Sequence, residues 1–134
     1  MANRQPEMLL NKLEVDSIFS FNKTQWSQAA AQWTAPGWTL QVFEHDSGTQ
    51  ITGFEPSTGI GLCIQPFFRD ETRPPDAVIV GGYFPLGMMP PMADKSRREM
   101  ESVAQSQIGA AYSLRLKLEI KNKREMFEFL ITEL

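Results

Sequence analysis

The densest cluster of chemically capable side chains in this sequence of 134 residues is His45-Asp46-Ser47, which holds the residue types of a hydrolase triad. A triad depends on spatial geometry and not on adjacency. Three consecutive residues in a tight turn point away from one another, and Asp and Ser in turns bond their own backbone. Together with Glu44, the cluster offers only a loose metal site, because a closed site needs four ligands. The cluster therefore predicts a hairpin turn, and no metal site is assigned.

The chain has one cysteine and one histidine, which excludes an intrachain disulfide and a multi-histidine metal centre. Cys63 lies within a predicted strand, without the basic neighbour or helix N-terminus that activates a thiol, and is interpreted as a buried structural residue. An enzyme would have to use carboxylates such as Asp70, Glu71 or Asp76 as acid and base. No nucleophile, base and oxyanion donor occur at recognisable spacing. We therefore assign no catalytic residue and no cofactor.

Two glycine-rich stretches invite comparison with phosphate-binding loops. Gly59-Ile60-Gly61 lacks the spacing of a dinucleotide-binding loop, and neither it nor Gly81-Gly82 is followed by the Gly-Lys-Ser/Thr that opens a helix. Gly81-Gly82 lies inside an apolar strand. It indicates either a structural bend or another group that lies close over the backbone.

Arg97 and Arg98 fall in the first turn of a predicted helix, where cations oppose the helix dipole. A bound anion would reverse that penalty, because free N–H groups and two guanidinium groups would converge on it. The alternative is that both side chains are solvated and partly neutralised by Glu99 and Glu101. Both arginines are kept as candidate ligands of an anionic group.

The net charge of −3 argues against a general nucleic-acid-binding protein. Basic residues between Arg115 and Arg124 could line one sheet face, but nucleic-acid binding through a sheet also needs aromatic residues there, and the outward positions of 113–121 have none. No apolar run approaches the ~20 residues that cross a bilayer, and the first residues are too interrupted for a signal peptide. We expect no nucleic-acid partner, no membrane and a cytoplasmic location.

The most unusual stretch is 66–92, which contains most of the nine prolines and overlaps an uncharged loop at 85–93. Its candidate apolar anchors are Phe67, Phe68, Tyr83, Phe84, Met88, Met89 and Met92, with Arg69 and Arg73 at the rim. Uncharged apolar loops tend to mark interaction sites, and Met adapts to varied partners. The loop either packs on its own core, forms an interface with a partner or a second copy, or lines a ligand pocket.

Hydrophobic spacing predicts the helices that would position these residues. Asn22 and Gln25 form a capping box for a helix over about 23–34. A second capping box at 96–99 begins a helix that runs to about residue 108. Residues 7–15 could form a further short helix.

Strands are predicted at 38–44, 49–54, 60–67, 77–84 and 112–121. The segment 77–84 is apolar on both faces, which indicates a central strand. In 114–120, leucines and Ile120 point inward and charged residues outward, which is typical of an antiparallel sheet with one solvated face. Residues 123–134 fit either a helix or a strand that pairs back on 112–121, and the strand is favoured.

This order predicts a single two-layer α+β domain over residues 8–134, after a flexible tail at 1–7. An antiparallel sheet of about five to six strands would have two or three helices packed on one face. At the level of the fold alone, the element order and acidity resemble those of small bacterial secretion chaperones and toxin-immunity proteins.

The predicted function is a non-catalytic protein-binding module of adaptor, chaperone-like or immunity-like type. Its interface would be the apolar loop, and its partner another protein or a second copy in a homodimer. The alternative is a domain that binds a small anionic or apolar molecule in a pocket between sheet and helix. A small hydrolase that uses carboxylates is the third hypothesis.

Overall fold

The computed structural model describes residues 12–86 and 94–134. Its helices are α1 (Lys12–Ile18), α2 (Lys23–Ala31) and α3 (Asp94–Ile108). Its strands are β1 (Thr39–His45), β2 (Gly48–Glu55), β3 (Ile60–Phe67), β4 (Ala77–Pro85), β5 (Tyr112–Lys121) and β6 (Arg124–Glu133). The predicted tail at 1–7 and most of the loop at 85–93 lie outside the described residues.

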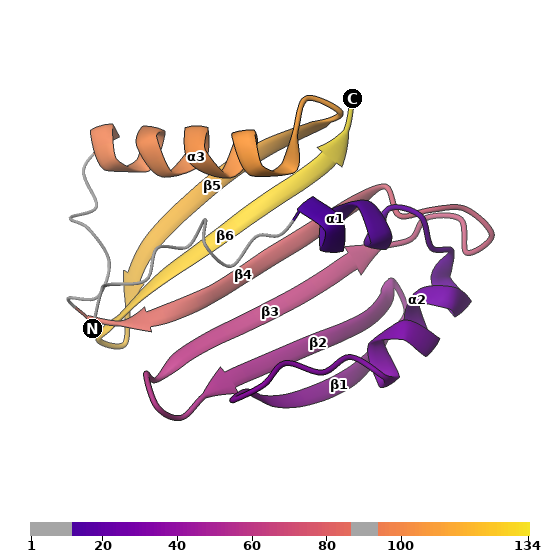
Figure 1. Ribbon diagram of the computed structural model, residues 1–134, viewed down its shortest axis with the longest axis horizontal. Coiled ribbons are helices and arrows are strands. Elements are labelled where there is room, and N and C mark those ends of the chain that lie inside the picture. Colours follow the sequence, from indigo (N-terminus) through magenta and orange to yellow (C-terminus); the bar gives the residue numbers. More distant parts are fainter. Residues whose placement is uncertain (1–11, 87–93) are drawn as a thin grey trace.

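All six strands form one antiparallel sheet in the order β1-β2-β3-β4-β6-β5 (Figure 1). Three consecutive hairpins build β1 to β4, and α3 then carries the chain to the far edge, so that β6 returns between β5 and β4. The prediction of a two-layer α+β domain with an antiparallel sheet is confirmed. The central position of β4 is also confirmed, because it pairs with β3 on one side and with β6 on the other.

Local capping explains where the helices begin and end. The Asn22 side chain accepts a hydrogen bond from the Gln25 backbone, and the Gln25 side chain accepts one from the Asn22 backbone, each at 2.9 Å. Helix α3 begins at Asp94, two residues before the expected cap at Ser96, and ends before Gly109, whose φ of 88° closes a helix without strain. The described part of the helix expected over 7–15 is found as α1, which extends past residue 15 to Ile18; residues 7–11 lie outside the described chain.

The last segment is a strand, as favoured by its aromatic and β-branched residues. Strand β6 pairs with β5 along its whole length, from Tyr112 opposite Glu133 to Lys121 opposite Arg124. The two-residue turn between them places Asn122 and Lys123 at φ of 54° and 60°. Two successive positive φ values are typical of the hairpin turn whose twist matches that of the strands.

The two faces of the sheet differ in what covers them. Cross-strand partners share a face, and one face carries the buried row Ile51, Ile64, Val80, Phe129 and Leu116. The helices pack on this face, which we call the helix face: Trp26 of α2 donates to the Thr49 carbonyl oxygen at 2.6 Å, and the Phe19 ring after α1 lies 5.0 Å from that of Tyr112. Within the described residues no helix covers the other face, which we call the open face.

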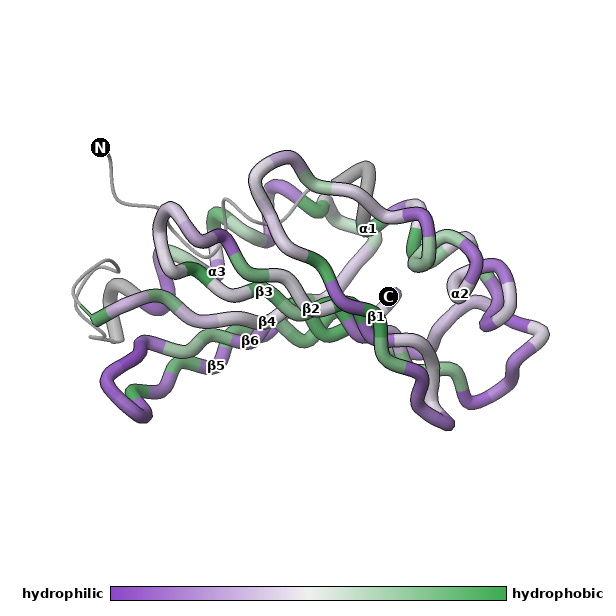
Figure 2. The backbone as a smooth tube through the Cα atoms, turned by 90° about the horizontal axis from the view of Figure 1, so that it is seen from below, coloured by the Kyte–Doolittle hydropathy of each residue, from purple (hydrophilic) through white to green (hydrophobic). Residues whose placement is uncertain are grey.

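Hydropathy varies along the chain (Figure 2). The strands carry most of the hydrophobic positions, and the tip of the β5–β6 hairpin is hydrophilic. Ile120, expected to be buried, is on the helix face but 58% exposed, because it lies near this tip and beyond α3. None of the helices in residues 12–86 and 94–134 combines the length and the apolar character that a bilayer-spanning helix requires.

Candidate functional site

The register of the strands sorts the open face into rows of side chains that run across the sheet. The first row is Thr39, Phe54, Gly61, Tyr83 and Met126, from β1 to β6. The second row is Gln41, Thr52, Cys63, Gly81 and Glu128. A third row contains Phe43 and Gln50 on one side and Ile79 and Leu130 on the other. The centre of the second row therefore carries only small side chains, between rows that carry large ones.

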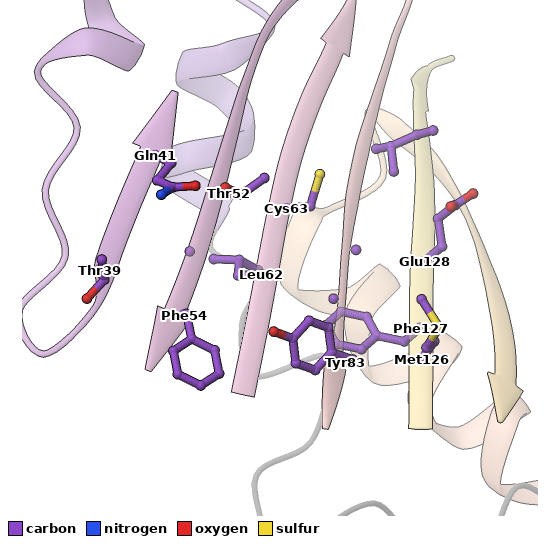
Figure 3. Close-up of a pocket in the computed structure, with 14 residues that line it drawn as sticks. Thr39, Gln41, Thr52, Phe54, Leu62, Cys63, Tyr83, Met126, Phe127 and Glu128 are labelled. Carbon is purple, nitrogen blue, oxygen red and sulfur yellow. The ribbon is translucent and has the colours of Figure 1, made fainter. Parts of the chain in front are cut away.

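This difference in size produces a pocket on the open face, with a volume of about 540 Å³. We call it the open-face pocket. Phe54, Tyr83 and Met126 line one side, Ile79 lines the other, and Thr52, Cys63 and Gly81 lie between them. Figure 3 shows the labelled side chains projecting from five strands, with the helices behind the sheet. The volume falls within the roughly 300–1,000 Å³ typical of sites for small molecules.

Glycines let the pocket form at this position. A Cβ atom on Gly61 would collide with the ring of Tyr83, so the ring lies flat over the β3 backbone. A Cβ atom on Gly82 would collide with the Gly61 carbonyl group, whereas one on Gly81 would meet the Phe127 carbonyl oxygen at 3.1 Å. Of the two interpretations of Gly81-Gly82, the structure favours a group that lies close over the backbone, because the β3 backbone lies against Gly82. Gly81 has no side chain and therefore leaves space at the floor of the pocket.

Cys63 lies on the pocket floor and is half-buried, where full burial was expected. The Gln50 side-chain amide donates to its sulfur at 2.9 Å, and Oε1 of the same side chain lies 2.7 Å from Nε2 of His45. Burial raises the pKa of the Cys63 thiol; the hydrogen bond from Gln50 partly offsets this rise, and the charge of Glu128 adds a smaller rise. A thiol in this environment stays protonated and is a poor nucleophile. The one histidine thus orients an amide and does not activate the cysteine.

Tyr83 is held in place from two sides. Its ring lies over Gly61, and the guanidinium carbon of Arg124 is 4.5 Å from its centroid. Such a cation–π contact is worth about 0.5–1 kcal/mol at an exposed position. Tyr83 is therefore a preorganised wall of the open-face pocket.

The sequence-predicted apolar anchors do not form one surface. Tyr83 lines the open-face pocket, and Phe67 lies half-buried at the end of β3 on the same face. Phe68 and Phe84 are buried core residues, at 7% and 0% exposure. Their burial makes both inaccessible to a partner. The ring centroid of Phe84 lies 5.5 Å from that of Phe127 on the helix face. The remaining candidates, Met88, Met89 and Met92, lie outside the described residues.

Arg69 and Arg73, expected at the rim of this surface, lie in the β3–β4 loop around a polar hollow of about 500 Å³. Asp70 and Asp76, two of the three carboxylates considered for catalysis, share this hollow. Hydrogen bonds from the backbone and hydroxyl of Thr72 hold the pKa of Asp70 below its usual value. Asp76 accepts from the Arg69 backbone at 2.9 Å. These bonds stabilise the loop itself, and Glu71 is exposed outside the hollow.

Arg97 and Arg98 lie exposed near the start of α3, beside a separate hollow of about 440 Å³ that Arg115 of β5 also lines. Glu101 shares the hollow and accepts a hydrogen bond from the Leu116 backbone N–H at 2.8 Å. This second arginine pair is therefore at the β5 edge of the sheet and does not meet the open-face pocket.

Sequence reasoning missed most of the pocket, including Phe54, Thr52, Ile79 and Met126. Each lies at an outward position of its own strand, where a threonine or a single apolar residue is unremarkable. A signal for the pocket was present in the alternation of all strands taken together. Once the strands are aligned, the outward positions form rows, and Gly81 is the position in its row that has no side chain. Comparison with known proteins gives no match to a family model, a curated protein or a solved structure.

Proposed function

We propose that this protein is a non-catalytic binding domain that holds a small, flat, mainly apolar molecule in the open-face pocket. The observation that carries the proposal is the row of small side chains, Thr52, Cys63 and Gly81, enclosed between larger apolar ones on a face that the helices leave uncovered. A β-sheet face exposed to water is ordinarily polar. Four apolar residues of this face, Phe43, Phe54, Met126 and Leu130, are each about 36–44% exposed.

The chemistry of the lining defines the class of ligand. Phe54 and Tyr83 offer aromatic surfaces, and a glycine floor allows a planar molecule to approach the backbone. Hydrogen-bonding groups lie at one end, on Thr39 and Gln41, and the carboxylate of Glu128 lies at the other. The pocket suits a neutral or weakly cationic aromatic molecule, and Glu128 disfavours an anion. An anionic ligand would suit the hollow beside Arg97 and Arg98 better.

The absence of an assigned reaction rests on particular groups. The Cys63 thiol has a raised pKa. Its hydrogen-bond partner among the described residues is the Gln50 amide, which cannot act as a general base. The carboxylates of the β3–β4 loop are bound within that loop. A cytoplasmic location fits the free thiol. An interface through Met88, Met89 and Met92 stays a prediction.

The proposal is tested by binding of the neutral fluorescent probe N-phenyl-1-naphthylamine, which becomes bright in apolar sites. We expect saturable binding to the unmodified protein. Cys63→Phe should abolish it, because the ring would occupy the space between Thr52 and Gly81. The matched control is Lys117→Phe, which adds the same ring to the same row, opposite Glu128 on β5 and outside the pocket.

Both variants are checked for cooperative thermal unfolding, since a loss of binding counts only in a folded protein. Saturable binding that survives in Cys63→Phe contradicts the proposal, as does an unmodified protein that binds no neutral aromatic probe. If the probe binds, native mass spectrometry of protein purified from cells would then reveal a co-purifying molecule as added mass. A bound ligand would also raise the thermal midpoint.

A further inference from the structure

Strand β1 is one edge of the sheet, and the backbone groups of every second residue point away from β2. The two-residue turn between His45 and Gly48 makes these residues a directly hydrogen-bonded pair. Bonded and outward positions alternate along an antiparallel strand. The N–H and C=O groups of Leu40, Val42 and Glu44 therefore point outward. Within the described residues, no hydrogen bond reaches these groups.

The same rule holds at the other edge, where it can be checked. In β5 it turns the backbone groups of Tyr112 and Leu116 outward, and α3 binds both of them. Gln105 donates to the Tyr112 carbonyl oxygen at 2.8 Å, and Glu101 accepts from the Leu116 N–H at 2.8 Å. The first half of the β5 edge is thus covered by its own helix.

The two edges also differ in charge. Proteins protect exposed edges with lysine, charged side chains or proline. Strand β5 carries Arg115, Lys117 and Lys121, whereas β1 contains no Lys, Arg or Pro. The one carboxylate of β1, on Glu44, accepts from Thr49 at 2.9 Å on the helix face. Strand β1 thus lacks the devices that keep another strand away.

Apolar side chains flank the β1 edge on both faces. Val42, beside Ile51 on the helix face, is 41% exposed, and Phe43 on the open face is 44% exposed. A strand that joins β1 would cover both while it completes the backbone hydrogen bonds. This combination of unpaired backbone and apolar flanks is what strand addition uses for affinity.

We propose that a second copy of this chain pairs through its own β1, antiparallel and with the two-fold axis at Val42. This centre is the one that pairs all seven residues of the strand, since it places Thr39 opposite His45 of the partner subunit. It opposes no like charges, because Glu44 then lies opposite Leu40 of the partner subunit. The self-complementary arrangement is the isologous contact of most homodimers.

The pairing also extends the open-face pocket. With the axis at Val42, Phe43 of the partner subunit lies directly opposite Gln41, which lines the β1 end of that pocket. The two sheets join into one, and their open faces become continuous. Each copy thereby contributes an aromatic side chain beside the pocket of the other.

The experiment is sedimentation equilibrium of the full chain over a wide range of concentrations. We expect the unmodified protein to have twice the mass of one chain. Val42→Pro removes an outward N–H that no intrachain bond uses, and Val42→Lys places a charge at the two-fold axis, so each should yield monomers. The matched control is Ile120→Lys, an exposed apolar residue at an outward position of the β5 edge, which should remain dimeric.

The proposal is overturned if the unmodified protein is monomeric at all concentrations. This holds also if the monomer binds a foreign peptide at β1 instead of a second copy. Dimers that persist in both Val42 variants, or that are lost only in Ile120→Lys, overturn it as well. The two Val42 variants are compared by circular dichroism, so that a misfolded Val42→Pro leaves Val42→Lys to decide. The mass is measured without any ligand, so this result is independent of probe binding to the open-face pocket.

Discussion

Two phenylalanines on opposite faces of the sheet should separate stability from binding. Phe84 is fully buried on the helix face, whereas Phe54 is 40% exposed in the wall of the open-face pocket. Phe84→Ala should cost about 3–5 kcal/mol of the free energy of unfolding, because it leaves a cavity beside Phe127. Phe54→Ala removes a ring that is 60% buried and opens its space to water, so no cavity is added. Taking about 2.5 kcal/mol for full burial, its cost is about 1.5 kcal/mol.

The order should reverse for binding of the naphthylamine probe. Loss of the Phe54 ring removes one aromatic contact with the ligand, worth about 0.5–1.5 kcal/mol beyond its area, or up to about tenfold in the dissociation constant. Phe84→Ala should leave the affinity of the folded fraction unchanged, since its side chain does not line the pocket.

The assays are urea unfolding followed by tryptophan fluorescence and probe titration in the same buffer. The unfolding midpoints should rank the unmodified protein first, Phe54→Ala second and Phe84→Ala last. Equal losses of stability for the two variants would refute the reasoning, since they would mean that the open face is covered as fully as the helix face.

Three other substitutions or conditions test single contacts. Trp26→Phe removes the indole N–H that donates to the Thr49 carbonyl oxygen, and urea unfolding should show a loss of about 1–3 kcal/mol; an unchanged midpoint would mean that this bond contributes nothing. Because burial raises the pKa of Cys63 in the folded protein, alkylation of Cys63 by iodoacetamide should begin at higher pH in the folded protein than in urea. The contribution of this thiol to the free energy of unfolding is present below the ordinary thiol pKa and should decline as the pH rises above that pKa. Identical profiles of alkylation rate against pH would argue against the burial of Cys63. Gly61→Ala places a methyl group under the Tyr83 ring and should cost about 1–3 kcal/mol while it displaces this wall and weakens probe binding, so full binding would show that the ring adapts without loss.

Most of the fold could be predicted from local pattern because each element carries its own signal. The Asn22 and Gln25 capping box, the leucine alternation of β5 and the glycine after α3 act over a few residues, and each is found in the structure. Which of the inward-facing side chains are buried was less predictable. Ile120 keeps the alternation of its strand and yet is exposed, because burial depends on how far α3 reaches and not on β5.

The pocket was beyond local pattern for a physical reason. Thr52, Cys63 and Gly81 come from three strands, and only the cross-strand register places them in one row. A shift of one residue in any strand would exchange its faces and remove the row. Of the predicted aromatic anchors, Tyr83 points to the open face and lines the pocket, whereas its neighbour Phe84 points to the helix face and is buried.

The strand order also has a consequence for how the chain folds. Four of the five strand pairings are hairpins between neighbours in sequence, of the kind that forms in about 1–10 μs. The fifth, between β4 and β6, joins residues as distant along the chain as Val78 and Ile131. Closing it requires the whole α3–β5–β6 unit to dock on the β1–β4 meander, at the entropic cost of the intervening loop. We expect this seam, whose buried Val80 lies opposite Phe129, to form in the slow step of folding and to hold the two halves of the domain together afterwards.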